Sequence, residues 1–342
     1  MLRIPYMKTM TTNAARIPAD ASRSPLWSWL RRNRRGLALP VMFVIAVVAF
    51  AVGAPAFLTT DNLTNVARQS VYLLIISLGQ LIAMIGGGLD LSVGALVSLA
   101  SVTGATVMAA VFATMPEAPG LAIAAGVATI VLIGMATGLV NGLGVTKLQI
   151  SPFMMTLGMG SVLFGITLLV SGGAPVYGLP RELGSIFGFG EWFGIPIPAL
   201  VALLLVALTY ALLEWSRYGR HLYATGGNPR AALLSGVRTH RVIVASFVLS
   251  SVMAALSGFL LTARLGTGEA NIGASMPLDS IAACVIAGVS LSGGQGRTFK
   301  VLLGTLLIML VQNGLNLMQV GAYAQTMVIG AILIFAMALA RD

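Results

Sequence analysis

Long apolar runs separated by short polar breaks make up most of the chain after residue 36. A run of about 20 apolar residues is long enough to cross the hydrocarbon core of a bilayer as a helix. Ten such segments can be marked out, some of them short or interrupted by glycine. They cover residues 37–58, 68–86, 91–114, 120–144, 152–172, 196–214, 242–264, 277–290, 299–317 and 321–340. The pattern predicts an all-α polytopic membrane protein with about ten transmembrane helices.

The basic residues test this segmentation independently, because the segments were chosen on apolar character alone. Cytoplasmic loops of membrane proteins carry an excess of Lys and Arg. With ten spans and the N-terminal basic cluster inside, seventeen of the twenty Lys and Arg residues fall on the cytoplasmic side, and only Arg68, Arg181 and Arg264 fall outside. Removing one span would reverse this bias for the rest of the chain. We therefore expect both termini to be cytoplasmic.

Composition agrees with this class, since 57% of the residues are hydrophobic and only 9% are charged. Residues 37–342 are predicted to form a single transmembrane domain, preceded by a flexible basic cytoplasmic tail at residues 1–36. A cleaved signal peptide is the alternative for this region, because Ala54, Pro55 and Ala56 loosely resemble a cleavage site. The net charge of +10 is explained by topology, since the basic residues lie between apolar runs, and it does not indicate nucleic acid binding.

The longest polar interruption beyond the N-terminal tail covers residues 215–241 and holds five arginines, both histidines and no acid. Its middle predicts one short helix, because Asn228 suits the N-cap, Pro229 the first helical position and Gly236 the end. The apolar residues of this helix are Ala231, Leu233, Leu234 and Val237. It is too short to cross a bilayer, so it is expected either to lie among lipid headgroups or to insert into a groove of a cytosolic partner.

The predicted outer loop at residues 172–196 contains Arg181, Glu182, Glu191 and Trp192. Two interpretations remain open. The loop is either the landing site of an external partner or an interfacial loop anchored by aromatic side chains.

Two carboxylates lie in apolar surroundings, where a charge is costly unless it reaches water or a partner. Asp90 follows three glycines, among them Gly87 and Gly88, and precedes Ser92. These residues form either a broken-helix element beside a solute route or a turn in which Asp90 or Ser92 caps the next helix. Asp279, near the start of another predicted helix, has the same two interpretations.

Several uncharged polar residues also lie in predicted spans. They are Gln80, Asn141, Thr156, Gln312, Asn313 and Asn316. Such side chains either hold helices together through hydrogen bonds or line a path for a hydroxylated solute. Phe153 either stacks on a sugar ring or simply packs.

Other kinds of chemistry find no support in the sequence. The glycine-rich loop at residues 290–300 lacks the P-loop pattern, so no nucleotide site is readable. The single cysteine, Cys284, excludes an internal disulfide or a cysteine metal cluster. Both histidines, His221 and His240, fall in the polar stretch at residues 215–241, away from any nucleophile or paired-acid motif. If ATP drives this protein, another polypeptide must bind it.

Five stretches resemble, in order, the permease subunits of ribose-type sugar ABC importers. They are GGGLDLSVGALVSL from Gly86, GLVNGLGVTKLQISPFMMTLGM from Gly138, GRHLYATGGNPRAALLSGV from Gly219, LDSIAACVIAGVSLSGGQGR from Leu278 and NGLNLMQVGAYAQ from Asn313. The resemblance runs from about residue 58 to the C-terminus. It implies a type II ABC-importer-like bundle in the bacterial inner membrane.

The resemblance also implies partners and site residues. The implied partners are a second permease subunit, identical or different, two cytosolic ABC ATPase domains that bind the ATP, and a periplasmic sugar-binding protein. The implied ATPase-coupling residues are Arg217, Gly219, Arg220, Gly226, Gly227, Asn228, Pro229, Ala231, Ala232, Leu234, Ser235 and Gly236. The candidates for the substrate pathway or a helix break are Gly87, Gly88, Asp90, Ser92, Asn141, Phe153, Thr156, Asp279, Asn313 and Asn316. No cofactor, metal or enzymatic activity is expected of this chain itself.

The predicted function is therefore the membrane subunit of an ATP-driven importer for a pentose, hexose or polyol. The alternative is a stand-alone secondary transporter for a small polar solute, in which Asp90 and Asp279 would couple ions. An integral membrane enzyme is disfavoured, because no catalytic cluster lies in the predicted spans.

Overall fold

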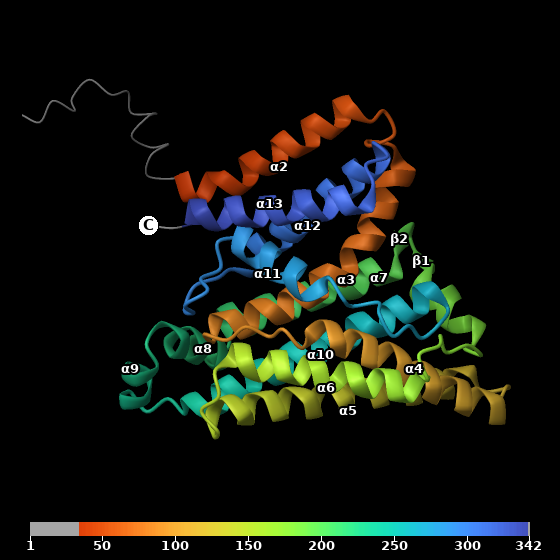
Figure 1. The fold of residues 1–342 in the computed structure, drawn as a ribbon, viewed down its shortest axis with the longest axis horizontal. Coiled ribbons are helices and arrows are strands. Elements are labelled where there is room, and N and C mark those ends of the chain that lie inside the picture. Colours follow the sequence, from red (N-terminus) through yellow and green to blue (C-terminus); the bar gives the residue numbers. More distant parts are fainter. Residues whose placement is uncertain (1–33, 341–342) are drawn as a thin grey trace, which may run out of the picture. The chain divides into compact units, whose positions relative to one another are not determined.

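The computed structural model describes residues 34–340. By their contacts, residues 1–38 and residues Leu39–Asp342 are separate units, and the description below is of the second. The predicted cytoplasmic tail lies outside the described residues except for its last three positions. Figure 1 shows the second unit as a bundle of helices with one very short hairpin.

Helices of the described chain overlap all ten predicted apolar segments. They are α2 (Arg34–Gly53), α3 (Thr60–Ile85), α4 (Val93–Thr114), α5 (Pro119–Thr146), α6 (Pro152–Ser171), α7 (Ile197–Tyr210), α10 (Thr239–Leu265), α11 (Met276–Ile286), α12 (Thr298–Leu317) and α13 (Ala322–Ala340). A π-helical turn, η2 (Ala211–Trp215), extends α7. Seven helices of the described chain are long and apolar enough to cross a membrane: α3, α4, α5, α6, α7 with η2, α10 and α12. A helical polytopic protein is confirmed, and the number of crossings stays a prediction.

The polar stretch between α7 and α10 folds into two short helices, α8 (Arg217–Gly227) and α9 (Pro229–Leu234). The predicted helix corresponds to α9. The Asn228 side chain accepts a hydrogen bond from the Ala231 N–H at 3.0 Å, Pro229 is the first helical residue, and Gly236 has a φ of +85° just beyond the end. The capping signals in the sequence were therefore sufficient to place α9, while α8 was not predicted.

The hairpin lies in the predicted outer loop. Strands β1 (Glu191–Trp192) and β2 (Ile195–Pro196) pair antiparallel and follow the π-helical turn η1 (Leu183–Gly188). Figure 1 shows β1 and β2 at the opposite end of the bundle from α8 and α9. The polar stretch that contains α8 and α9 and the loop that contains the hairpin thus lie at opposite ends of the helices.

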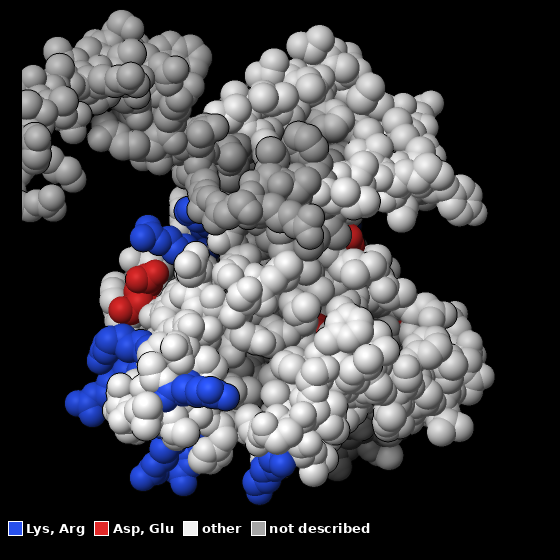
Figure 2. Space-filling view, turned by 60° about the vertical axis from the view of Figure 1, so that its left-hand side comes forward, with Lys and Arg blue, Asp and Glu red and all other residues white. Residues whose placement is uncertain are grey.

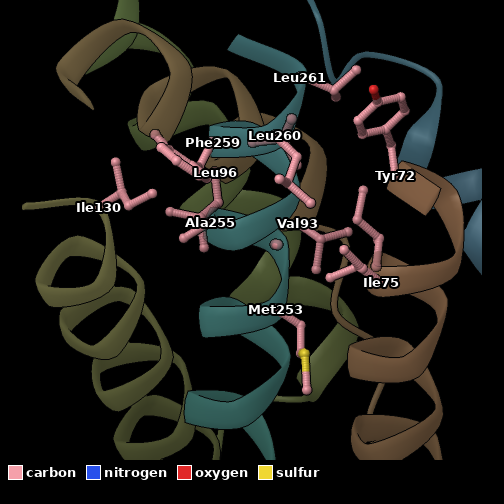
Figure 3. Close-up of a cluster of buried hydrophobic side chains, with 14 of the residues drawn as sticks. Tyr72, Ile75, Val93, Leu96, Ile130, Met253, Ala255, Phe259, Leu260 and Leu261 are labelled. Carbon is pink, nitrogen blue, oxygen red and sulfur yellow. The ribbon is translucent and has the colours of Figure 1, made fainter. Parts of the chain in front are cut away.

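The apolar core surrounds α3, and an apolar 18-residue stretch of this helix is 89% buried inside the protein. Figure 3 shows Ile75 of α3, Val93 and Leu96 of α4, and Phe259 and Leu260 of α10 among the side chains of this core. Because α3 is covered on nearly all sides, its polar side chains must find partners within the protein rather than in water.

Close contact between α5 and α10 depends on three glycines spaced by four residues, Gly134, Gly138 and Gly142. A Cβ added at Gly138 would overlap the Val248 Cα, and one added at Gly142 would lie 2.6 Å from the Val244 Cα. Small residues at this spacing let helices approach closely in a membrane, where no hydrophobic effect drives them together. The sequence of α5 therefore determines which of its faces meets α10.

Candidate coupling and translocation sites

The short helix α9 presents an apolar face to its surroundings. Leu233 is 60% exposed and Leu234 is 89% exposed, and Ala231 is also exposed. Ala232 differs from its predicted companions, because it is only 4% exposed and holds α9 on the protein. Large exposed leucines on a capped helix, surrounded by charges, are typical of a docking surface.

Basic side chains surround this face. Five exposed arginines lie on or next to the two short helices. Arg217 and Arg220 belong to α8 and Arg230 to α9, while Arg238 precedes α10 and Arg241 lies in its first turn. Figure 2, which brings this end of the molecule forward, shows Lys and Arg side chains gathered along one side of it. A partner for this surface would carry acidic groups around an apolar groove.

Helix α8 is anchored to the bundle through direct backbone contact. A Cβ added at Gly226 would overlap the carbonyl oxygen of Ile85, the last residue of α3. The same carbonyl oxygen accepts a hydrogen bond from the Gly294 N–H at 2.9 Å. Of the predicted coupling residues, Gly219 and Gly226 are therefore packed inside the protein, where they position the segment rather than present a surface.

Two tyrosines of α8 complete this anchor. The Tyr223 hydroxyl donates to the Gly296 carbonyl oxygen at 2.8 Å, and the Tyr218 hydroxyl donates to the Val242 carbonyl oxygen at 3.3 Å. Burial raises the pKa of the Tyr218 hydroxyl above its usual range, so this group stays protonated and remains a donor. Helix α8 is thus tied to α3, to α10 and to the loop before α12.

The chain leaves helical geometry after α3 and crosses the interior before α4 begins. Gly87 has a φ of +84°, which turns the backbone away from the α3 axis. Gln80 faces the backbone of Asp90, and in the amide orientation that these neighbours require, its nitrogen donates to the Asp90 carbonyl oxygen at 3.1 Å and its oxygen accepts from the Asp90 N–H at 3.3 Å. Thr156 of α6 donates to the Leu89 carbonyl oxygen at 3.0 Å and accepts from the Leu91 N–H at 3.1 Å.

The Asp90 carboxylate lies within this polar cluster. Its Oδ1 accepts from the Ser92 N–H at 3.1 Å and from the Ser92 hydroxyl at 2.6 Å. The Ser92 Oγ in turn accepts from the Asn141 amide at 2.9 Å. Asp90, Ser92, Asn141, Thr156 and Gln80 are all 0% exposed. These bonds support the role of holding helices together, which the sequence left open for Gln80, Asn141 and Thr156.

The capping hypothesis for Asp90 and Ser92 was wrong in its detail. Ser92 is the N-cap residue of α4, but in the described chain its side chain accepts no hydrogen bond from that helix. Asp90 accepts from Ser92 itself and so closes a turn one residue before the helix begins. The Ser92 hydroxyl instead donates to Asp90 and accepts from the Asn141 amide of α5.

The remaining predicted pathway residues are spread over the molecule. Asn313 forms a reciprocal amide pair with Asn62 of α3, both bonds being 2.9 Å long, and so connects α12 to α3. Asn316 and Phe153 are exposed on the outside of their helices, and Asp279 is half-buried in the first turn of α11. The structure therefore groups Asp90, Ser92, Asn141 and Thr156 but separates them from Asn313 and Asn316.

A groove of about 310 Å³ lies beside the polar cluster. It is lined by Leu91, Gly94, Ala95, Ser98, Leu157, Gly160, Ser161, Phe164, Ala270, Asn271, Gly273, Ala274 and Pro277. Within residues 34–340, none of the predicted pathway residues lines this groove, although Leu91 adjoins Asp90. Most of the lining residues that the sequence analysis missed are small, and a few carry hydroxyl or amide groups. The Gly- and Ala-rich segment at residues 270–274 was the one sequence feature that could have indicated the groove.

Comparison with known proteins agrees with this arrangement. Residues 62–337 match the family described as the permease component of branched-chain amino acid transport systems. The chain belongs to this permease family. It is 37% identical to the D-allose transport system permease protein of Escherichia coli, over 87% of this chain and 90% of that protein. It is 39% identical, over the same shares, to the ribose import permease protein of Bacillus subtilis.

The galactose/methyl galactoside import permease protein of Salmonella typhimurium is 34% identical to this permease, over 91% of this chain and 94% of that protein. No solved structure matches the permease. The resemblance found in the five motifs is confirmed, and the family match covers residues 62–337 of the predicted extent. The permease is a multi-pass protein of the bacterial inner membrane, and its family is a transport component rather than an enzyme by itself.

The contact between Gly226 and Ile85 gives a first prediction. Gly226→Ala should lower the thermal stability of the detergent-solubilised permease, because an overpacked buried position costs about 1–3 kcal/mol. Gly227→Ala is the matched control, since a Cβ at that neighbouring glycine meets no atom within 4 Å. Equal melting temperatures for the two variants would show that α8 does not pack closely on α3.

The Asp90 cluster gives a second prediction. Asp90→Asn should keep the fold and sugar uptake close to wild type, because its side-chain oxygen still accepts from Ser92. Asp90→Leu should destabilise the permease by about 1–3 kcal/mol, because the buried Ser92 donors lose their acceptor. Thermal unfolding and uptake into cells would be measured for both variants. A folded Asp90→Asn variant without uptake would contradict the structural role and indicate that the charge itself is needed.

Proposed function

We propose that this permease is the membrane subunit of an ATP-driven sugar importer, with ten membrane crossings, both termini in the cytoplasm and a type II importer-like bundle. The observation that carries the proposal is α9, which exposes Leu233 and Leu234 among arginines while α8 fixes it to the bundle. A cytosolic ABC ATPase would receive this helix in a groove. The positive-inside distribution of basic residues supports placing α8 and α9 in the cytoplasm.

Coupling would act through α8. Movement of α9 with the ATPase would displace Gly226 and the Ile85 carbonyl oxygen together, because their close contact does not allow α8 to move relative to the end of α3. Ile85 is directly followed by the irregular segment at residues 86–92, which adjoins the groove between α4 and α6. ATP binding to a pair of ATPase domains would thereby change the shape of the groove.

The substrate class is inferred from the relatives and from the groove. The similar proteins are permeases for D-allose, ribose and galactose or methyl galactoside, all of which are sugars or a sugar derivative. Ser98, Ser161 and Asn271 bring hydroxyl and amide groups to the groove, and Phe164 brings an aromatic face. Such groups can exchange hydrogen bonds with sugar hydroxyls without binding the sugar tightly.

A second permease subunit would close the groove. Helix α6 forms one wall of the groove, and an apolar 18-residue stretch of this helix is only 17% buried in the single chain. A periplasmic binding protein would deliver the sugar at the end that carries β1 and β2. The alternative of a secondary transporter is less well supported, because it gives no role to the exposed apolar face of α9.

The coupling role of α9 predicts the effect of a triple substitution. Changing Ala231, Leu233 and Leu234 to Asp should abolish co-purification with the cognate ABC ATPase, because charges replace the apolar face. Leu148→Asp is the matched control, since Leu148 is a leucine 71% exposed in the loop between α5 and α6. Both variants should keep the wild-type melting temperature.

Two results would contradict the proposal. One is a wild-type permease that binds no ATPase but moves sugar by itself in liposomes, which would indicate a secondary transporter. The other is a triple variant that still binds the ATPase as tightly as wild type.

The groove predicts a further difference between two glycines of α6. Gly160→Leu should reduce sugar uptake by about tenfold, because the side chain would occupy the groove and cost the passing sugar about 1.4 kcal/mol of interaction. Gly158→Leu should have little effect, since Gly158 does not line the groove and a Cβ there meets no atom within 4 Å. Uptake by cells would be compared at equal expression. Equal uptake by the two variants would exclude this groove from the sugar path.

A further inference from the structure

Two arginines and a tyrosine meet at the end of the bundle that carries the hairpin. Arg68 and Tyr72 lie one helical turn apart on α3, and Arg264 lies in the last turn of α10. The Tyr72 hydroxyl lies beside the Arg264 guanidinium and within electrostatic reach of Arg68. Glu191 of β1 forms an ion pair with Arg68. We call Arg68, Tyr72 and Arg264 the outer basic cluster.

The outer basic cluster has many more donors than acceptors. Each guanidinium group carries five N–H donors. Within the described chain, Arg68 donates to Glu191, and Arg264 makes a single long bond of 3.5 Å to the Asn65 side-chain oxygen. That oxygen is shared, because it also accepts from Gln69 at 3.1 Å. The Arg264 guanidinium is therefore poorly satisfied.

Several of the unused donors are buried. The Arg68 Nε and the Arg264 Nη1 have almost no exposed surface and no hydrogen-bond partner, and the equally buried Tyr72 hydroxyl has only the Arg264 guanidinium beside it. Tyr72 as a whole is only 4% exposed. Figure 3 shows Tyr72 at the edge of the drawn cluster, with its hydroxyl turned away from Ile75. A buried donor without a partner is destabilising, and for a charged group the cost is larger.

The cluster is also unbalanced in charge. Among the described residues, the two guanidinium groups have one carboxylate partner, Glu191, so one positive charge has no ion-pair partner there. The Glu191 carboxylate is on a hairpin of two-residue strands, and its side chain is 45% exposed, whereas the Arg68 side chain is 23% exposed. The acid is therefore the more accessible and more easily displaced member of the pair.

We propose that the outer basic cluster is a binding site for a carboxylate side chain of the sugar-binding protein, and that Glu191 occupies part of this site until the partner's carboxylate displaces it. An arginine guanidinium group binds a carboxylate through two parallel hydrogen bonds, and the Tyr72 hydroxyl would add a third donor. An incoming acid would satisfy both guanidinium groups, and Glu191 would return to water with the hairpin. The inference rests on the proposed function, since it assumes that this end faces the binding protein.

The test measures binding of the cognate sugar-binding protein to the full permease in lipid nanodiscs, at low and at high salt. Arg68→Gln and Arg264→Gln should each weaken binding by about tenfold or more, because a buried charged contact is lost. Glu191→Gln should strengthen binding by about threefold or more, because the internal competitor is removed. The opposite signs separate a displaceable acid from a purely structural ion pair.

Matched controls are available in the same outer loop. Arg181→Gln and Glu182→Gln make the same charge changes at exposed positions outside the cluster, and each should alter binding by less than about twofold. Arg68→Lys and Arg264→Lys keep the charge but lose the paired donors of the guanidinium group. They should weaken binding less than the Gln variants.

Each outcome has a defined meaning. Binding of the Arg68 and Arg264 variants equal to that of Arg181→Gln would overturn the site. Weaker binding by Glu191→Gln would overturn the displacement. Absence of binding by the wild type would overturn both. Retention of the ABC ATPase by all variants would show that the proposed function stands even where this inference fails, whereas its loss from the wild type would remove the proposed function itself.

Discussion

The backbone between α3 and α4 leaves helical geometry inside a helix bundle, and the need to satisfy its N–H and carbonyl groups constrains much of the structure around it. No water is available in the hydrocarbon region to replace helical hydrogen bonds. Gln80 and Thr156 supply these bonds to residues 89–91, and the Ile85 carbonyl oxygen receives the Gly294 N–H. Side chains of α3 and α6, and the loop before α12, are therefore all tied to one irregular segment.

This arrangement connects two regions that are far apart in the sequence. Gly226 of α8 touches the same Ile85 carbonyl oxygen, so the polar helices at one end of the molecule meet the last residue of α3, directly before the irregular segment. A regular helix resists change because its hydrogen bonds are internal, whereas an irregular segment depends on side chains that belong to other helices. The proposed coupling between α9 and the groove would follow this contact.

The two ends of the bundle use basic residues differently. Around α9 the arginines are exposed and separated, so each remains hydrated and contributes mainly to the approach of a partner. At the hairpin end Arg68 and Arg264 are partly buried beside Tyr72, where desolvation makes each missing hydrogen bond costly. The first arrangement favours fast association, and the second favours selection of one geometry.

The sequence by itself determined the helices of the ten apolar segments, the capped α9 and the family, because apolar length, N-cap chemistry and ordered motifs are local properties. Asn228, Pro229 and Gly236 lie within nine positions of one another and specify α9 without help from the rest of the chain. The role of Asp90 was not local. Only the tertiary structure showed that it binds Ser92, that Asn141 completes the cluster from α5, and that Asn313 instead pairs with Asn62. The same holds for the groove and for the outer basic cluster, whose members are up to about two hundred positions apart and meet only through helix packing.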